Sequence, residues 1–448
     1  MFDHRKSRYL LSEKAFTKIS IFDQRSNVGG IWNTDSRSPA ADIAAYPSPI
    51  YHDMESNIPT EVMRYYNNPF PPNVPLLPDA GQVLQYLRAY AEDVIPHVEM
   101  KLRHEVIDVT PLQRNRSTGW KLNVHALAND LFLEESYDAV VVANGRYNKP
   151  YEPAIPGLDK WRTQHPETVL HSKFYKSPQR FKDKKVLIIG FSSSGVNTAN
   201  AIEPVCAKPL LISQKSGDGL SPGSKGFQEG RFLLPPVIEF NAEDKTVLFA
   251  DNTMESGIDY VLFCTGYEYE YPFLSSLPGF ELGGGEGNTK TYQYIFHIDF
   301  VTLSFITMPL RVVAFPFAET QAAVVARVWS GRLSLPSYQD MEMWVNKTTE
   351  IRGPGKAFHK LSYPADADYI NEMYDWCQQA RAENAEKFLA PPIWGERERW
   401  LRRTSHDIRR ATEAHGKERF AIKSIEDAGF HYSEEPTAKP LEEYKPKG

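Results

Sequence analysis

A turn of small residues near the middle of the chain is the feature best suited to chemistry. The apolar run Val186 to Ile189 leads into Gly190-Phe191-Ser192-Ser193-Ser194-Gly195, a GxSxSG pattern in which Ser192 replaces the usual middle glycine and Ser194 precedes the last one. Gly190 and Gly195 allow a tight turn, and the free amides of a helix that begins there can bind the pyrophosphate of a dinucleotide. An ordinary turn in a parallel sheet gives a similar pattern, so the surrounding segments must decide between the two.

A lysine follows the next predicted strand. Residues 209–213 read as a strand, and Lys215 lies two residues beyond its end, with no carboxylate in the turn between Ser213 and Ser216. In a dinucleotide-binding unit this place meets the 2′ position of the adenosine ribose, so a cation there favours NADPH over NADH. A solvated surface lysine is the alternative.

A second candidate nucleotide unit lies at the beginning of the chain. Residues 17–22 read as a strand that leads into Asp23, and Gly29, Gly30 and Trp32 form the turn that follows. An acidic residue at the end of such a strand accepts hydrogen bonds from ribose hydroxyls, which is the role expected of Asp23. Solvated turn chemistry is the alternative for this residue.

The segment ahead of that strand is short. Residues 5–16 read as the end of a helix, and neither a strand nor a GxGxxG turn precedes them. In the doubly wound order the first strand lies centrally, so its absence leaves residues 17–22 without one hydrogen-bonding neighbour. We therefore expect the first strand of this unit to be missing and the sequence to be N-terminally incomplete.

Two further apolar strands end in similar small-residue turns, at residues 140–145 and 260–267. One follows each candidate nucleotide unit, which indicates two parallel sheets linked by crossings of the chain. The predicted fold class is α/β with two dinucleotide-binding, Rossmann-like domains. Residues 81–94 have apolar residues at helical spacing, so Tyr86 and Tyr90 are expected to belong to the core.

Composition limits the classes of partner. The 448 residues carry a net charge of −6 with both signs interspersed, which argues against nucleic acid and favours small ligands. Three scattered cysteines form neither a zinc motif nor a disulfide framework, so we expect no metal site and a reducing, cytoplasmic location. No apolar run is long enough to span a bilayer. The oligomeric state stays open, a homodimer included.

Together these segments resemble the flavin-containing monooxygenases, particularly their fungal members. The resemblance runs from about Arg5 to the mid-300s. It depends on several motifs in order: Phe22-Asp23-Gln24-Arg25 with Gly29-Gly30-Ile31-Trp32, Tyr51 to Met63, His171 to Tyr175 ahead of GxSxSG, Phe263 to Tyr267, and Phe315 to Gln321.

The resemblance implies an NADPH-binding domain inserted into an FAD-binding domain. The expected boundaries are 1–176 and 269–390 for the two parts of the FAD domain, 177–268 for the NADPH domain, and 391–448 for a charged helical extension. In the family, NADPH reduces the flavin, dioxygen forms a C4a-hydroperoxyflavin, and an amine nitrogen or sulfide takes the distal oxygen. The cofactors carry this chemistry, and the protein positions them and excludes water.

The same resemblance assigns two more residues. Asn57 matches the asparagine beside the flavin and is the expected catalytic residue, the alternative being an amide that ties down its own loop. Gln321 is expected to bind cofactor.

The chain also departs from the family pattern. The fingerprint FxGxxxHxxx(Y/F) keeps His171 and Tyr175, but His165 and Glu167 replace its Phe and Gly. Thr307 stands where a glycine is expected near the flavin ring.

Two alternatives to amine or sulfide oxygenation remain. A Baeyer-Villiger type ketone oxygenase shares the two-domain plan, although Tyr175 rather than Trp at the end of the fingerprint argues against it. A flavin-free protein that binds NADPH or a partner through the surviving domain is the other.

Overall fold

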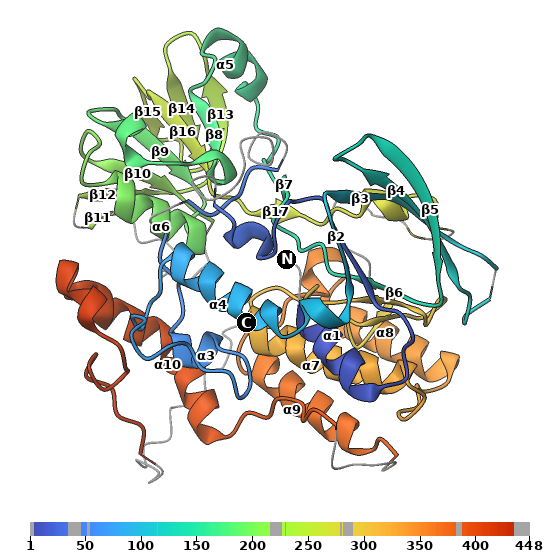
Figure 1. Ribbon diagram of the computed structural model, residues 1–448. Helices are drawn as coiled ribbons and strands as arrows, with labels where there is room; N and C mark the ends of the chain where they lie inside the picture. The colour runs from blue at the N-terminus through green and yellow to red at the C-terminus, as the bar shows by residue number, and fades with distance from the viewer. Residues whose placement is uncertain are drawn as a thin grey trace.

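The computed structural model describes residues 4–34, 46–51, 54–113, 115–215, 226–228, 230–277, 280, 290–381 and 388–433. Its helices and strands form three regions (Figure 1): a nucleotide unit at the upper left, a three-stranded sheet at the right, and a helical layer below. The predicted α/β class is confirmed.

The nucleotide unit is built on a six-stranded sheet. In spatial order its strands are β11 (Gly226–Gln228), β12 (Arg231–Leu234), β10 (Leu210–Ser213), β9 (Val186–Ile189), β16 (Tyr260–Phe263) and β8 (Val169–His171). The five strands other than β11 run parallel to one another, and β11 pairs antiparallel with β12. Every residue of β9 and β10 is buried, because both faces of this sheet are covered, and this explains their continuous apolar sequences.

Helices and a small sheet cover this unit. Its helices α5 (Leu158–Gln164) and α6 (Ser193–Ile202) accompany an antiparallel sheet of β13 (Val237–Asn241), β14 (Thr246–Phe249) and β15 (Met254–Glu255). Trp161 from α5 is fully buried against Phe240 of β13.

The chain enters and leaves the nucleotide unit through one pair of short strands. β7 (Lys149–Pro150) pairs antiparallel with β17 (Tyr267–Glu268). Because β8 belongs to the six-stranded sheet, this sheet includes residues ahead of the expected boundary at 177. We therefore propose that the inserted domain begins near residue 151.

The first unit has a divided sheet. β1 (Ser20–Asp23) pairs in parallel with β2 (Glu99–Leu102). A separate four-stranded sheet has the order β18 (Thr291–Tyr292), β19 (Phe296–His297), β20 (Leu303–Phe305) and β6 (Val140–Val142). Within the described ranges, no strand pairs with the second edge of β1 or of β6, so the expected gap in this sheet is present.

Helices form the lower layer of the molecule (Figure 1). They are α1 (His4–Glu13), α3 (Thr60–Met63), α4 (Ala80–Glu92), α7 (Ala314–Trp329), α8 (Tyr338–Arg352), α9 (Ala365–Gln378) and α10 (Glu396–Ala414). α1 packs on α7, and the buried Glu13 carboxylate accepts from Arg332 Nε at 2.7 Å. In α4, Tyr86 and Tyr90 are buried as predicted.

The third region is the antiparallel sheet of β3 (His104–Pro111), β4 (Trp120–Ala126) and β5 (Leu131–Tyr137). In β4 every second residue is buried, because one face of the sheet packs on the core. Trp120 is fully buried there, and its ring contacts Phe300 edge to face. This sheet therefore extends the core of the first unit.

Candidate nucleotide and flavin site

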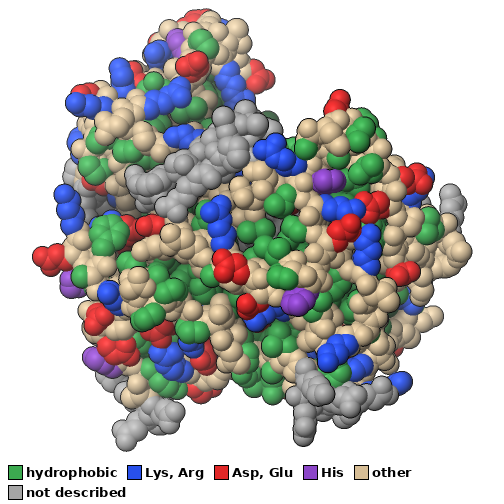
Figure 2. Space-filling model, in the orientation of Figure 1, with side chains coloured by type: hydrophobic (Ala, Val, Ile, Leu, Met, Phe, Trp, Pro, Cys, Tyr) green, Lys and Arg blue, Asp and Glu red, His purple; other side chains and the backbone are tan. Residues whose placement is uncertain are grey.

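A cavity of about 1720 Å³ lies between the nucleotide unit and the rest of the molecule. Its walls include all of β1 and β6, the turn between β9 and α6, and the loop that carries Asn57. On the face drawn in Figure 2, hydrophobic side chains gather in the hollow between the upper lobe and the right-hand lobe. The cavity also includes the strip between β1 and β6, since both strands line it.

The geometry of the GxSxSG turn fits a pyrophosphate. Gly190 has φ +95°, and a Cβ there would lie 2.6 Å from the Cys264 carbonyl oxygen. A Cβ on Gly195 would lie 2.3 Å from the Gly190 carbonyl oxygen, so both positions require glycine. α6 begins immediately after Ser192, which makes no side-chain capping bond, so the first amides of the helix remain suited to an anion.

Three of the four predicted residues of this turn line the cavity. Gly190, Ser192 and Ser194 are on its wall, whereas Gly195 lies behind the turn against Gly190. Lys215 follows β10, is exposed and also lines the cavity. The turn and the lysine therefore lie where the phosphates of one dinucleotide would need them.

The ribose-binding candidate Asp23 lies at the end of β1. It is 7 % exposed, and its Oδ1 accepts from the Arg25 amide at 2.9 Å. Gly29 has φ +113°, and a Cβ there would lie 2.4 Å from Leu84 Cδ1, so this turn also requires glycine.

Gly30 and Trp32 form η1 (Gly30–Trp32), and both line the cavity. The indole nitrogen of Trp32 is buried, and no hydrogen-bond partner for it occurs among the described residues. An orphaned donor beside the cavity fits a ligand on this side. The residues present therefore fit the ribose and flavin ends of FAD, whereas the described part offers no glycine-rich turn for its pyrophosphate.

Apolar side chains line the strip between β1 and β6. The cavity that includes this strip is lined by Ile19 and Ile21, by Val141 of β6, and by Phe315 and Trp329 of α7. Because β1 is bonded only to β2 and β6 only to β20 among the described strands, each presents one unpaired edge. A strip with these walls has the form of a vacant strand position.

Asn57 lies where the first unit meets the nucleotide unit. Its side chain is exposed, lines the cavity, and donates from Nδ2 to Ser193 Oγ at 3.4 Å. Ser193 is the first residue of α6. This placement brings the expected catalytic amide next to the helix that would hold the NADPH phosphates.

Gln321 lies away from the cavity wall. It is fully buried in α7 and is not among the residues that line the cavity. Its Oε1 accepts from the Thr307 amide at 2.8 Å, and its Nε2 donates to the Tyr369 hydroxyl at 3.1 Å. Both ends of the amide are therefore used inside the protein, and Gln321 holds the backbone of Thr307, which does line the cavity. Its role in cofactor binding stays a prediction.

At two positions where the family pattern has glycine, this chain has another residue in the left-handed conformation that glycine favours. Thr307 has φ +60° and Glu167 has φ +64°. Left-handed conformations are unfavourable for non-glycine residues, above all for a β-branched threonine. The two substitutions therefore change the side chain, and the backbone keeps a positive φ.

His171, which the fingerprint keeps, is 1 % exposed. Its Nδ1 accepts from the Lys173 amide at 3.1 Å, so its Nε2 carries the proton that it donates to the Gly266 carbonyl at 3.0 Å. Burial lowers the pKa of this imidazole and favours its neutral form. The fingerprint histidine therefore ties β8 to the turn after β16.

Sequence reasoning missed two cations: the half-buried Arg146, which lines the cavity, and the buried Lys173, which donates from Nζ to Oδ1 of the cavity residue Asn148 at 3.1 Å. Arg146 donates from Nη1 to the Thr307 and Pro309 carbonyls at 2.7 and 2.9 Å. Lys173 is 6 % exposed, and burial lowers its pKa. Arg146 follows directly after the turn at Gly145, which was the available signal, whereas no local pattern marks Lys173 as buried.

One of the three cysteines, Cys264, lines the cavity. All three cysteines are free and buried, as packing residues would be. Among the described residues, no group of three His, Cys, Asp or Glu side chains could hold a metal ion. In the same part of the chain, no helix has the length and apolarity needed to cross a membrane.

Comparisons with known proteins agree with this architecture. The flavin-binding monooxygenase-like family model matches residues 15–223 and 230–388. The chain is 28 % identical over 383 residues to flavin-containing monooxygenase FMO GS-OX-like 2 of Arabidopsis thaliana, covering 82 % of this chain and 81 % of that one. It is 26 % identical to flavin-containing monooxygenase iboF of Amanita muscaria, covering 75 % and 72 %.

Solved structures show the same fold. S-allyl-L-cysteine S-oxygenase from Allium sativum superposes with a TM-score of 0.75 at 25 % identity, covering 93 % of this chain and 91 % of that one. Cyclohexanone monooxygenase superposes with a TM-score of 0.57 at 12 % identity, covering 86 % and 96 %. The chain belongs to the flavin-containing monooxygenase family, whose members depend on FAD and NADPH.

Proposed function

We propose that this protein is an NADPH-preferring monooxygenase that transfers one oxygen atom of dioxygen to a soft nucleophile, an amine nitrogen or a sulfide sulfur. The observation that carries the proposal is the junction at Asn57, where the flavin-side loop and the phosphate-binding helix α6 meet in one cavity. When bound, FAD and NADPH supply hydride transfer and oxygen activation.

The chain's own residues position the reactants. The amides of the Gly190 to Gly195 turn hold the NADPH pyrophosphate, and Lys215 attracts its 2′-phosphate. Asn57 Nδ2 is a neutral donor at the cavity surface that can bind a developing negative charge without supplying a proton.

A cluster of aromatic side chains forms an apolar surface on the flavin side of the cavity. Phe315 is 2 % exposed and lines the cavity, and its ring lies 4.9 Å from that of Tyr65. Tyr86 and Phe70 stack behind them at 3.8 Å between ring centres. Such a wall limits water at the reacting centre, which protects a reactive oxygen species from decay.

Sulfur is the nucleophile favoured by the comparisons. The Allium sativum relative is an S-oxygenase by its name, and it shares the fold over most of both chains. Cyclohexanone monooxygenase, at 12 % identity, supports the fold alone and gives no argument for a ketone substrate.

One observation favours the flavin-free alternative for the chain as printed. Among the described residues, no strand or glycine-rich turn that could hold the FAD pyrophosphate lies in the strip between β1 and β6. A visible absorbance spectrum of the purified protein separates the two readings, because bound flavin absorbs in the visible range.

The oxygenase proposal is tested by turnover with FAD supplied. We expect NADPH oxidation with a thioether to give a sulfoxide that carries label from isotopically labelled dioxygen, and turnover of a cyclic ketone to be much slower. Faster lactone formation from the ketone would replace the proposal with the Baeyer-Villiger alternative.

A further inference from the structure

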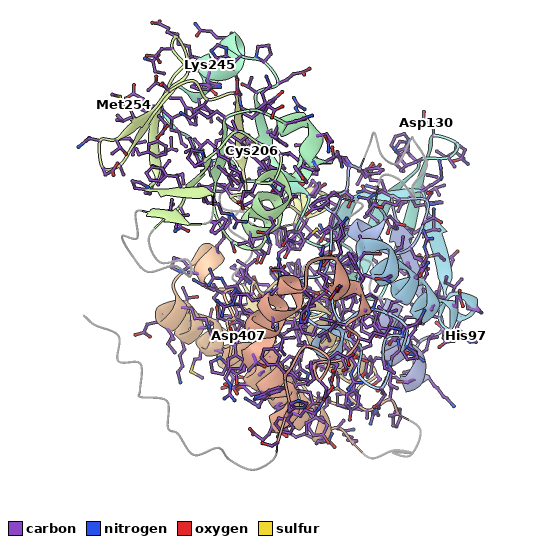
Figure 3. All side chains as sticks on the ribbon, turned by 90° about the vertical axis from the view of Figure 1, so that its left-hand side faces the viewer. His97, Asp130, Cys206, Lys245, Met254 and Asp407 are labelled. Carbon is purple, nitrogen blue, oxygen red and sulfur yellow. The ribbon has the colours of Figure 1, made fainter. Side chains whose placement is uncertain are left out.

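The C-terminal extension contacts both halves of the site. Helix α10 and the short helix η9 (Gly416–Ala421) follow the last residue of the family match. In Figure 1 the upper end of α10 lies below α6, and in Figure 3 α10, marked by Asp407, lies beneath the unit that carries Cys206. The extension therefore reaches from the flavin half to the nucleotide unit.

The contact to the nucleotide unit is made by Arg409. Its guanidinium donates from Nη2 to Asn197 Oδ1 and from Nε to Glu413 Oε1 at 2.7 Å. Asn197 lies on α6, one turn after Ser193, and is 8 % exposed. The side chain of Arg409 is 12 % exposed, so this bond is largely shielded from water.

The contact to the flavin half is made by Arg419. Its Nη2 and Nε donate to the two oxygens of Glu55 at 2.6 and 3.0 Å. Glu55 precedes Asn57 by two residues on the same loop. A bidentate pair fixes orientation as well as distance, so η9 holds the loop that presents Asn57.

Together these contacts link the extension, α6 and the Asn57 loop to one another. The extension binds α6 through Arg409 and the Asn57 loop through Arg419, while Asn57 and Ser193 contact each other directly. Movement of α10 or η9 would change the distance between the two partners of the Asn57–Ser193 contact. The GxSxSG turn itself, residues 190–195, does not belong to the extension.

We propose that the C-terminal extension positions the phosphate-binding helix against the Asn57 loop, with Arg409 and Arg419 as positioning residues. This inference depends on the proposed function, because it assigns NADPH to the turn before α6. The turn remains intact when Arg409 is changed, so the affinity for NADPH and the rate of hydride transfer should separate.

The test compares Arg409→Ala, Arg409→Lys and Arg410→Ala. Arg410 is the matched control, because it is the adjacent arginine of the same helix and its side chain is 69 % exposed and bonded to Asp407 of that helix. NADPH affinity is measured by fluorescence titration, which needs no flavin. Flavin reduction at saturating NADPH is measured by stopped flow with FAD in large excess over the protein, so that a weak FAD site is still filled. Hydrogen exchange of residues 193–202 reports the hold on α6 directly.

We expect Arg409→Ala to slow flavin reduction by about tenfold, since misplacement of reactants by less than about 1 Å has effects of this size. NADPH affinity should stay within about threefold, and exchange in α6 should rise. Arg409→Lys should recover part of the rate, and Arg410→Ala should match the parent protein.

Equal reduction rates and equal exchange for Arg409→Ala and Arg410→Ala would overturn the inference. A loss of NADPH affinity equal to the loss of rate would overturn it too, because Arg409 would then act on binding. If the parent protein itself fails to bind NADPH, the proposed function fails instead. Arg419→Ala gives a second, independent variant, for which we expect slower reduction and unchanged exchange in α6.

Discussion

The two nucleotide units of this protein use the same parts and differ in completeness. The inserted unit has a sheet of six paired strands with its glycine turn and helix at the carboxyl edge. The first unit keeps β1, Asp23 and α1, but β1 and β6 face each other across an apolar strip. In the described part of the chain, the first unit therefore has Asp23 at the end of β1 but no strand paired to the second edge of β1.

Filling the strip is expected to have the largest effect. A segment of about 12 residues, an apolar strand with a GxGxxG turn, joined ahead of α1 should pair with β1 and β6 and supply the missing amides. We expect stoichiometric bound FAD by visible absorbance and a higher melting temperature. A control with valine in place of the turn glycines should raise the melting temperature and remain colourless.

The opposite result for the chain as printed would contradict this view of the first unit. Stoichiometric FAD and a single cooperative melt without the added segment would show that other residues fill the strip.

Damaging the complete unit at its turn is expected to have the next largest effect. In Gly195→Val the new side chain meets the Gly190 carbonyl oxygen, so the turn must open. We expect NADPH affinity to fall about 100-fold in a fluorescence titration, because the pyrophosphate loses several amide donors. Gly395→Ala is the control, since Gly395 has φ −80° and the added Cβ would meet only Glu398 Oε2, at 3.4 Å. If Gly195→Val binds NADPH with the affinity of the parent protein, the GxSxSG motif is only a structural turn.

The charge on Lys215 should set the choice of dinucleotide. Lys215→Asp is expected to lower kcat/KM for NADPH by about 10-fold to 100-fold, the range of about 1.5 to 3 kcal/mol for a hydrogen bond to a charged group, and to affect NADH little. Lys245→Asp is the control, because Lys245 lies at the far end of the same unit in Figure 3. Equal kcat/KM for both dinucleotides in the parent protein would refute the role of Lys215.

Asn57 should act on the junction between the units. We expect Asn57→Asp to leave flavin reduction nearly unchanged, while product per NADPH falls and hydrogen peroxide rises, because a carboxylate repels a developing negative charge. Ser193→Ala removes the hydrogen bond to Asn57 without changing Asn57 itself. If both variants uncouple the reaction equally, Asn57 works by tying down its loop.

The smallest effect is expected at Thr307. Thr307→Gly should stabilise the protein by about 1 kcal/mol, because glycine adopts a positive φ without the cost that threonine carries. The melting temperature measures this gain. Thr307→Ala keeps a Cβ and is expected to give little of it, so an equal rise for both variants would argue against backbone strain.

Local patterns predicted the strands and turns of both units because apolar runs and glycine positions carry that information. The doubly wound strand order predicted that both edges of β9 are paired and that one edge of β1 is not. Gln321 was assigned by position in a motif, and only the packing of α7 shows that its amide is used internally. The contact between Arg409 and Asn197 joins residues far apart in the chain, and no local pattern reports such a pair.

The entry and exit of the inserted unit lie side by side at β7 and β17, where the Tyr151 amide donates to the Gly266 carbonyl at 2.9 Å. A segment whose two ends meet can be exchanged for another of the same kind without changing the distance that its host must bridge. Replacing the inserted unit as a whole could then change the preference for NADPH or NADH. The residues that select the oxygen acceptor would stay as they are. After such an exchange, the extension would still have to recognise the new phosphate-binding helix.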